Sequence, residues 1–550
     1  MKKKPIAMAL ILVSLLTLIA GCGSSAPPPV SQPPPVSQPP PAPAPAPASQ
    51  PSTSAAAPAT QAAAPKKEEL EFVELNMLFV GDAPPDAQKV EDALNKLLKE
   101  KINCKVTIRN TTWTDWVSKY EQELVAGTVD LVQTATWMNY GVYASQKAFL
   151  ELDDLLPKVA PDLYAAVESM LPQMKVGGKI YAVPTYWKEY VPSSCYYRED
   201  LRKKYDLPRP NSIENLEKYL LGIQAKEPER TLLRMIPASP GVGTFSTRYS
   251  YVFDMKYDRV GGRYGLMFER SHPTVPIDYW HSQDFIDDCK MLKRWCDQGF
   301  WSKSTLSDNV PTAYTVENDL AVAIFGGDGN PYHYTNAVRN VKAAGTNMEL
   351  GICIFGEEID NISVYPAHAG QNATAIAASC KNPERAMMLL NLLMMDEEVH
   401  HLIHYGIKGV HYDVVDGVYK LLSDATTPPF KYEGFQSWGI RNTKLMLRDE
   451  TAMLLQSIIE RLEPLAAKEK FPFANIDSGF FEDFSDYAAE RTAVMNVCAE
   501  YLMPLQSGVV SDVDAAVAEF LKKVDAAGLD IAREGFLKQW YAYCKEFGYE

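Results

Sequence analysis

The chain has 550 residues and a formal net charge of −15 at pH 7, with 46% hydrophobic and 22% charged residues. This length exceeds what one hydrophobic core usually supports, and the composition excludes a wholly disordered chain. The negative charge argues against a nucleic-acid-binding protein, which needs a basic surface for the phosphates. The only long apolar run lies at the N-terminus, which also argues against a protein with several membrane spans.

Residues 1–21 have the pattern of a secretory signal. Three lysines, Lys2 to Lys4, precede an apolar run from Ile6 to Ala20, which is shorter than the roughly 20 residues of a membrane span. Small residues then directly precede Cys22. This junction resembles the lipobox of bacterial lipoproteins, and the resemblance implies cleavage before Cys22 and lipid attachment to its sulfur. The alternatives are an ordinary secretory signal and a short uncleaved anchor.

Residues 22–67 are rich in proline and alanine and carry the motif PPPVSQ in tandem at 27–32 and 33–38. The segment has no periodic apolar face, so it cannot form a core. Proline-rich chains favour the extended polyproline II conformation. We therefore expect a semi-rigid tether between a lipid anchor at Cys22 and the folded part, the alternative being a proline motif that binds a partner.

The next hundred residues predict an α/β arrangement. Aliphatic runs bounded by turn signals indicate strands at 73–80, 105–110 and 129–134. Apolar residues at helical spacing predict a helix after Asp86 and a second over 114–126, which Gly127 would end. The apolar face of the first helix consists of Val90, Leu94, Leu97, Leu98 and Ile102, and that of the second of Trp116, Tyr120 and Leu124. This β-α-β-α-β order implies a parallel sheet with helices on both faces.

Large aromatic residues mixed with polar ones follow the predicted strands. Gly81-Asp82, Thr111 to Trp113 and Thr136 to Tyr140 come after the three strands, and Thr185 to Tyr190 comes after a further one at 179–184. In parallel sheets, ligands bind beyond the carboxyl ends of the strands. Aromatic rings stack on flat apolar faces while polar side chains hold hydroxyl groups. The loops therefore favour a polar, ring-shaped ligand, although each aromatic alone is more often part of a core.

Several segments resemble the extracellular solute-binding proteins of ABC importers, the family typified by maltose-binding protein. The resemblance covers the chain from about residue 70 to the end, and the order of the segments carries it more than any single motif. The segments are NYGVYASQKAFLELDDLLPK (139–158), GGKIYAVPTYWKEYVPSSCYYREDLRKKYDL (177–207), NDLAVAIFGGDGN (318–330), NPERAMMLLNLLMMDEEVHHLIHYGIKGVHYDV (382–414) and SWGIRN (437–442). They are most similar to the lipoprotein branch of Gram-positive bacteria, and 519–540 resembles its helical C-terminal extension.

The resemblance implies two α/β lobes joined by three hinge crossovers, with the ligand in a cleft between them. It places the crossovers near Glu189, near Phe325-Gly326-Gly327 and around Met395 to His401. Lobe one would comprise 68–190 plus 327–399. Lobe two would comprise 191–326 plus 400–550, including the C-terminal extension.

The same resemblance implies which residues would contact the ligand. Those of lobe one and its hinge are Asp82, Trp113, Trp137, Asn139, Tyr140, Tyr186, Trp187 and Glu189. Those of lobe two and the second crossover are Trp280, Asn330, Tyr332 and Trp438.

The resemblance implies a binding protein without catalysis or cofactor that captures a solute by hinge closure and delivers it to an ABC permease. We expect a monomer, lipid-anchored on the extracytoplasmic face of the cell membrane. The aromatic loops favour an oligosaccharide, and a peptide is the alternative ligand. Rival functions are a secreted glycoside hydrolase and a surface adhesin-type lipoprotein. The hydrolase needs two carboxylates across the scissile bond, and although Asp82 and Glu189 could face one cleft, nothing in the sequence marks them as such a pair.

Metal and disulfide chemistry find little support in the sequence. His400 and His404 are four residues apart, but the HExxH pattern and a third ligand are absent, so we predict no metal site. No CxxC pair occurs among the eight cysteines after Cys22. Most of them lie on predicted strands or apolar helix faces, where a cysteine behaves as a small hydrophobe. We therefore expect mostly free thiols.

Overall fold

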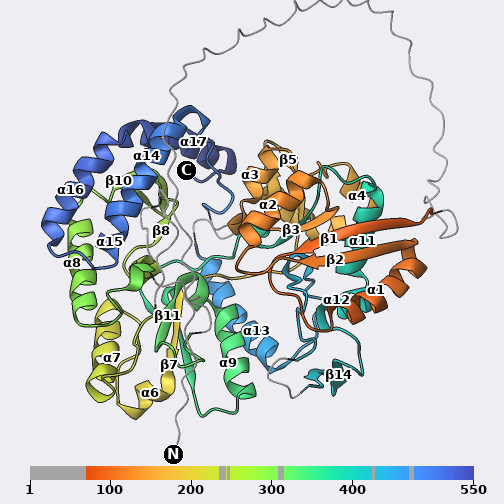
Figure 1. The fold of residues 1–550 in the computed structure, drawn as a ribbon, viewed down its shortest axis with the longest axis horizontal. Helices are drawn as coiled ribbons and strands as arrows, with labels where there is room; N and C mark the ends of the chain where they lie inside the picture. Colours follow the sequence, from red (N-terminus) through yellow and green to blue (C-terminus); the bar gives the residue numbers. More distant parts are fainter. Residues whose placement is uncertain (1–69, 235–242, 244–247, 308–314, 424–427, 470–475) are drawn as a thin grey trace, which may run out of the picture. The chain divides into compact units, whose positions relative to one another are not determined.

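The computed structural model describes residues 70–550 except 235–242, 244–247, 308–314, 424–427 and 470–475 (Figure 1). The predicted signal peptide, Cys22 and the tether lie outside the described residues. Within the described part of the chain, no helix is both long and apolar enough to cross a membrane.

The first sheet confirms the predicted β-α-β-α-β unit. Its five strands have the order β2-β1-β3-β13-β6. β1 is parallel to β2 and β3, and β13 is antiparallel to β3 and β6. The strands are β1 (Val73–Phe79), β2 (Cys104–Asn110), β3 (Leu131–Thr134), β6 (Ala182–Pro184) and β13 (Ala373–Ile376), and the helices between the first three are α1 (Ala87–Ile102) and α2 (Trp116–Ala126).

The helices of this sheet bury the faces that their periodicity predicts. Val90, Leu94 and Leu98 of α1 are fully buried, as is Tyr120 of α2, and Gly127 ends α2 in the left-handed conformation with φ 62°. The predicted inward residues Leu97, Trp116 and Leu124 are only half-buried against the same core. Further helices contribute to that core, among them α4 (Leu155–Val159), α5 (Pro161–Val167), α11 (Pro383–Met395) and α12 (Glu397–Tyr405). We call the elements on the five-stranded sheet lobe one.

A second, three-stranded sheet has the order β11-β7-β12, with both outer strands antiparallel to β7. Its strands are β7 (Ser194–Arg198), β11 (Ala323–Phe325) and β12 (Leu350–Ile354). The helices that accompany it are α6 (Glu199–Lys204), α7 (Ile213–Lys226), α8 (Gln283–Asp297), α9 (Pro331–Ala343), α10 (Phe355–Glu358) and α13 (Glu450–Ala466).

A further small sheet packs with the C-terminal helices around a core rich in aromatic side chains, among them Trp280, Phe536 and Trp540. Its order is β10-β9-β8. The strands are β8 (Arg259–Val260), β9 (Leu266–Glu269) and β10 (His272–Asp278), and the helices are α14 (Ala488–Val497), α15 (Met503–Gln506), α16 (Val513–Ala526) and α17 (Leu529–Phe547). The predicted C-terminal extension is thus helical. We call the elements on the three-stranded sheets lobe two.

Three connections join the two lobes, but two of them lie elsewhere than predicted. The first runs through Tyr190, as predicted, and forms a bridge there with Pro366 of the second connection, which links β12 to β13. The third leads from Asn442, which forms a bridge with Tyr186, toward α13. The connections therefore lie side by side, as expected for a hinge.

The predicted lobe boundaries at 327 and 399–400 are wrong for a packing reason. After Phe325 the chain stays on the same sheet, because β12 pairs along its whole length with β7. Likewise, Val399 and Ile403 of α12 are fully buried in the core of lobe one. The apolar side chains of these elements thus find their partners in the lobe opposite to the predicted one.

The remaining elements are short: α3 (Tyr140–Ser145), the pair β4 (Lys175–Val176) and β5 (Lys179–Ile180), and the hairpin β14 (Tyr412–Val415) and β15 (Val418–Leu421). All eight cysteines after Cys22 are free thiols, and all but Cys380 are buried. Among the described residues, no group of three or more His, Cys, Asp or Glu side chains could hold a metal ion.

Candidate ligand-binding site

The loops that follow β1, β2, β3 and β6 emerge at one edge of the five-stranded sheet. β6 runs parallel to β3, because both are antiparallel to β13. The Gly81 N–H donates to Thr111 Oγ1 (3.3 Å), which joins the first two loops. A Cβ on Gly81, which has φ 111°, would lie 3.0 Å from Trp113 Nε1. Glycine at this position therefore lets the indole of Trp113 approach the end of β1.

Trp113 and Trp137 lie on these loops, and each pairs with another tryptophan. Trp113 stacks on Trp438 with ring centroids 5.5 Å apart and an interplanar angle of 25°. Trp137 meets Trp116 edge to face at 5.8 Å and donates from Nε1 to the Gln371 carbonyl (2.9 Å). Trp113 and Trp137 remain 43% and 40% exposed. Two large indoles are thus held by neighbours and still accessible, as a stacking platform requires.

A polar pocket of about 360 Å³ lies next to Trp137. A small-molecule site typically occupies roughly 300–1,000 Å³. The lobe-one side is formed by Thr136, Trp137, Asn139, Tyr140, Gly141, Val142, Gln173, Lys175, Val176, His368 and Gln371. The lobe-two side is formed by Arg263, Asp477, Ser478, Gly479, Phe480, Phe481, Glu482, Phe484 and Arg491. Charged groups and aromatic rings from both lobes, together with the amides of lobe one, therefore face one space.

A buried ionic network occupies the hinge. The Arg441 guanidinium, only 2% exposed, donates from Nε to Glu433 Oε1 and from Nη2 to Glu433 Oε2 (3.0 Å). Its Nη1 lies 3.9 Å from Glu189 Oε1, and Asn372 donates to Glu189 Oε2 (3.1 Å). Burial raises the pKa of Glu189, although the Arg441 charge opposes this shift. The Tyr332 hydroxyl of lobe two also donates to Glu433 Oε2 (2.8 Å), so the network links the lobes.

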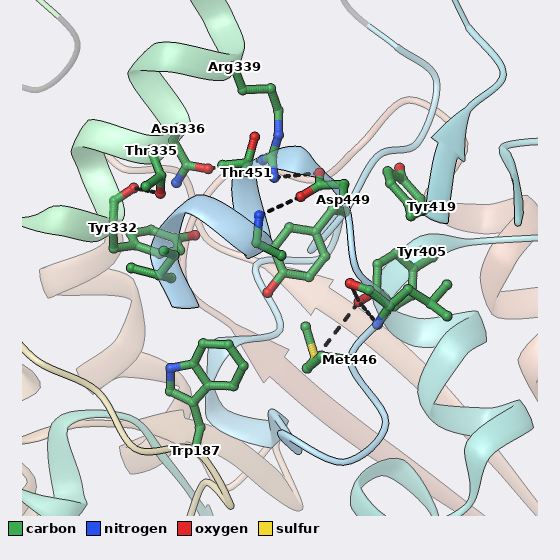
Figure 2. Close-up of a pocket in the computed structure, with 14 residues that line it drawn as sticks. Trp187, Tyr332, Thr335, Asn336, Arg339, Tyr405, Tyr419, Met446, Asp449 and Thr451 are labelled. Carbon is green, nitrogen blue, oxygen red and sulfur yellow. Dashed lines mark hydrogen bonds and ion pairs between the residues drawn. The ribbon is translucent and has the colours of Figure 1, made fainter. Parts of the chain in front are cut away.

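A second, smaller pocket of about 40 Å³ lies beside this network (Figure 2). Trp187, Tyr332, Tyr405, Tyr419 and Met446 contribute to its wall, and Arg339 pairs with Asp449 (2.9 Å) at its side. The Arg441 guanidinium lies 4.9 Å from the Tyr332 ring centre and 5.6 Å from that of Trp187. The cavity is too small for a sugar ring and lies where the first connection, α9 and α13 meet.

Comparisons with known proteins agree with this architecture. Residues 477–545 match the model of a domain of unknown function (DUF3502). A carbohydrate ABC transporter substrate-binding protein of Streptococcus pneumoniae is 23% identical over 464 residues, which cover 82% of this chain and 87% of that protein. The solved N-glycan transport solute binding protein NgtS of S. pneumoniae, in complex with Man1GlcNAc, has a TM-score of 0.65 and 20% identity, and the match covers 86% of this chain and 100% of that chain.

The chain has the fold of an ABC-transporter solute-binding protein. The S. pneumoniae substrate-binding protein FusA, solved in complex with kestose, gives a TM-score of 0.55 at 14% identity, and the match covers 87% of this chain and 100% of that chain. The predicted two-lobed α/β fold and the resemblance to solute-binding proteins are thereby confirmed.

This solute-binding-protein fold brings many of the predicted ligand-contacting residues together. Trp137, Asn139 and Tyr140 line the larger pocket, although the Tyr140 side chain is buried and donates to the Met174 carbonyl (2.6 Å). Trp113 and Trp438 form the stacked pair, and the exposed Asp82 directly follows Gly81, which lies against Trp113. These residues keep their place in the candidate site.

Other predicted contacts have different roles. Trp280 is fully buried, 5.1 Å from the Phe520 ring and packed directly on Gly265, so its prediction as a ligand contact is wrong. Asn330 caps α9 by accepting from the His333 N–H (3.0 Å). Tyr186, Trp187, Glu189 and Tyr332 lie on or beside the hinge, where Tyr186 exchanges backbone hydrogen bonds with the segment after Trp438.

Several pocket residues were missed in the sequence. Gln371 and His368 lie just before β13, and Asp477 to Phe484 precede α14. Arg441, which belongs to the hinge network and not to the pocket, lies in the SWGIRN segment, where Trp438 is the one predicted contact. In the local sequence, only Arg441 and the residues GFF at 479–481 could have indicated a site. A single glutamine or histidine before a strand gives no such indication.

Proposed function

We propose that this protein captures an oligosaccharide in the larger pocket and delivers it to an ABC permease. The observation that carries the proposal is the pocket itself, in which an accessible tryptophan and several amides of lobe one and charged side chains of both lobes face one space. A ligand that contacts both lobes favours the conformation in which they are close. The names of the relatives, which bind N-glycan fragments and kestose, support a sugar as the ligand.

In and around the pocket, each type of side chain has a distinct task. Trp137 offers an indole face for stacking on a sugar ring, and the Trp113–Trp438 pair extends the aromatic surface along the sheet edge. Asn139, Gln173 and Gln371 supply amides that donate to and accept from hydroxyl groups. The hinge network of Arg441, Glu433 and Glu189 lies beside the connections, where lobe movement would be accommodated.

Location and assembly belong to the same proposal. A signal at residues 1–21 and a lipid on Cys22 would anchor the chain to the extracytoplasmic face of a bacterial membrane, and residues 22–67 would act as the tether. We further propose that the protein acts as a monomer and needs no cofactor or metal. Palmitate labelling of the protein and of Cys22→Ala tests the anchor, because only the former should become labelled.

Intrinsic fluorescence tests the site. Titration of the protein with Man5GlcNAc and with kestose should change tryptophan emission saturably, since Trp113 and Trp137 are accessible. Release of monosaccharide during incubation would support the alternative of a glycoside hydrolase. A fluorescence response to peptides alone would favour the alternative peptide ligand, and binding only to whole partner proteins would favour an adhesin.

A further inference from the structure

The segment Asp477–Phe484, which opens the region matching the domain of unknown function, lies against both lobes. We propose that this segment is a clasp: it forms the second wall of the pocket and fastens lobe two to lobe one over a bound sugar. The role of the wall rests on the function proposed above. The fastening rests on the contacts of the segment alone.

The clasp is fixed rigidly to lobe two. The Phe480 ring lies 5.2 Å from Trp540 and 5.4 Å from Tyr543 of α17. Glu482 accepts hydrogen bonds from the hydroxyls of Tyr264 (2.6 Å) and Tyr487 (2.7 Å). The Asp483 N–H donates to Gln539 Oε1 and its carbonyl accepts from Gln539 Nε2, both at 2.8 Å. A segment held by ring contacts, a buried carboxylate and backbone hydrogen bonds must move with lobe two.

The same segment contacts lobe one through Phe481, the residue after Phe480. The Phe481 ring packs against the core of lobe one and fits so closely on Gly141 of α3 that a Cβ there would lie 2.3 Å from Cδ1. A Cβ on Gly479 would lie 2.8 Å from Nε2 of His368. Two consecutive phenylalanines thus enter different cores: Phe480 that of lobe two, and Phe481 that of lobe one.

This arrangement couples the pocket to the position of the lobes. The clasp lines the pocket opposite Trp137 and Gln371, and the Phe484 ring lies 4.1 Å from the Arg491 guanidinium at its edge. If the lobes separate, Phe481 must leave its seat on Gly141 and expose apolar surface. The clasp therefore favours the closed conformation in the absence of a sugar and slows the release of a bound one.

Two variants disrupt the contact between Phe481 and Gly141, one on each side of it. Phe481→Ala deletes the ring, and Gly141→Ala fills its place, although alanine would by itself strengthen helix α3. Ile531→Ala serves as the matched control, because Ile531 is an exposed apolar residue of α17. Spin labels on unnatural amino acids at Val125 of α2 and Val275 of β10, both exposed, report the distance between the lobes without a ligand.

The clasp predicts that both variants shift the label distances of the full protein to longer values, while Ile531→Ala leaves them unchanged. It also predicts about tenfold faster dissociation of Man5GlcNAc from both variants. Distances like those of the wild type in both variants would overturn the clasp. A wild type that binds no sugar would instead contradict the proposed function and the role of the wall, and the distance measurement would still decide the fastening.

Discussion

Trp113 and Trp438 stack at 5.5 Å although 325 residues separate them in the chain. The first follows β2 of the five-stranded sheet, and the second lies just before the third connection between the lobes. Their contact, together with the hydrogen bond from Trp137 to Gln371, gathers the tryptophans of the candidate site at one sheet edge. The site is thus built by the fold, from loops that are remote in sequence.

Replacing either accessible tryptophan should weaken sugar binding without unfolding the protein. Trp137→Ala and Trp113→Ala each remove a stacking surface, and we expect at least a tenfold loss of affinity, about 1.4 kcal/mol. Calorimetric titration measures the affinity, and circular dichroism measures the fold. Val125→Ala, an exposed site on α2, is the control. Unchanged affinity in both tryptophan variants would show that the solute binds elsewhere.

Trp280 should behave in the opposite way. Its indole is fully buried against Phe520, so Trp280→Ala leaves a cavity in the core of lobe two. We expect a loss of about 3–5 kcal/mol in the free energy of unfolding, measured by urea denaturation. Sugar affinity of the folded fraction should stay the same, and a selective loss of affinity with normal stability would return Trp280 to the site.

Breaking the ionic network at the hinge should lower the free energy of unfolding. Arg441→Gln leaves the carboxylate of Glu433, which is buried, without its charged partner, and we expect a loss of about 3–5 kcal/mol in unfolding free energy. The control is Arg461→Gln, whose exposed ion pair with Glu357 (3.0 Å) should contribute less than about 1 kcal/mol. Equal urea midpoints for the two variants would contradict a structural role of the network.

Stability should fall as the pH decreases from about 6.5 to 4. Burial lowers the pKa of His368 to about 4, and that of His400 to about 4 as well. In the unfolded chain each of these histidines takes up a proton near pH 6.5, whereas in the folded protein it does so only near pH 4. Each histidine therefore contributes stability at neutral pH that is lost as the pH falls. The loss is on the order of 3 kcal/mol for each histidine by pH 4.

The hydrogen bonding of His368 favours the neutral form of its ring in the folded protein. Its Nδ1 accepts a hydrogen bond from the Gly370 N–H (3.0 Å), which a protonated ring cannot do. Thermal midpoints between pH 4 and 7 should therefore depend less on pH in His368→Gln than in the wild type. His272→Gln, at an exposed position, should keep the wild-type profile, and an unaltered profile in His368→Gln would contradict the assignment.

Local sequence patterns were sufficient for the β-α-β-α-β unit of the first sheet, but not for its antiparallel strand β13. The spacing of Val90, Leu94 and Leu98 and the glycine at 127 determine the helices directly, because each feature acts within a few residues. The lobe boundaries were not predictable in this way. An apolar face such as Val399–Ile403 shows that a helix is buried but does not say in which core, and the partner of β12 lies about 150 residues earlier in the chain.

The same limit applies to the site. Trp137 and Trp280 both follow a strand and look alike in sequence, and only the packing of Phe520 on Trp280 distinguishes a core residue from an accessible one. The second wall of the pocket comes from Asp477–Phe484, more than 330 residues after Trp137. Its approach to lobe one depends on the seat at Gly141, which no local pattern of the clasp contains.

The most direct test of the account is a thermal-shift screen of the protein against a panel of oligosaccharides, with peptides as the contrasting set. A ligand that binds only the folded state raises the melting temperature once its concentration exceeds Kd. We predict a shift that rises with concentration for one family of oligosaccharides and is lost in Trp137→Ala. A shift with peptides alone, or none with any sugar after removal of ligand carried through purification, would contradict oligosaccharide capture.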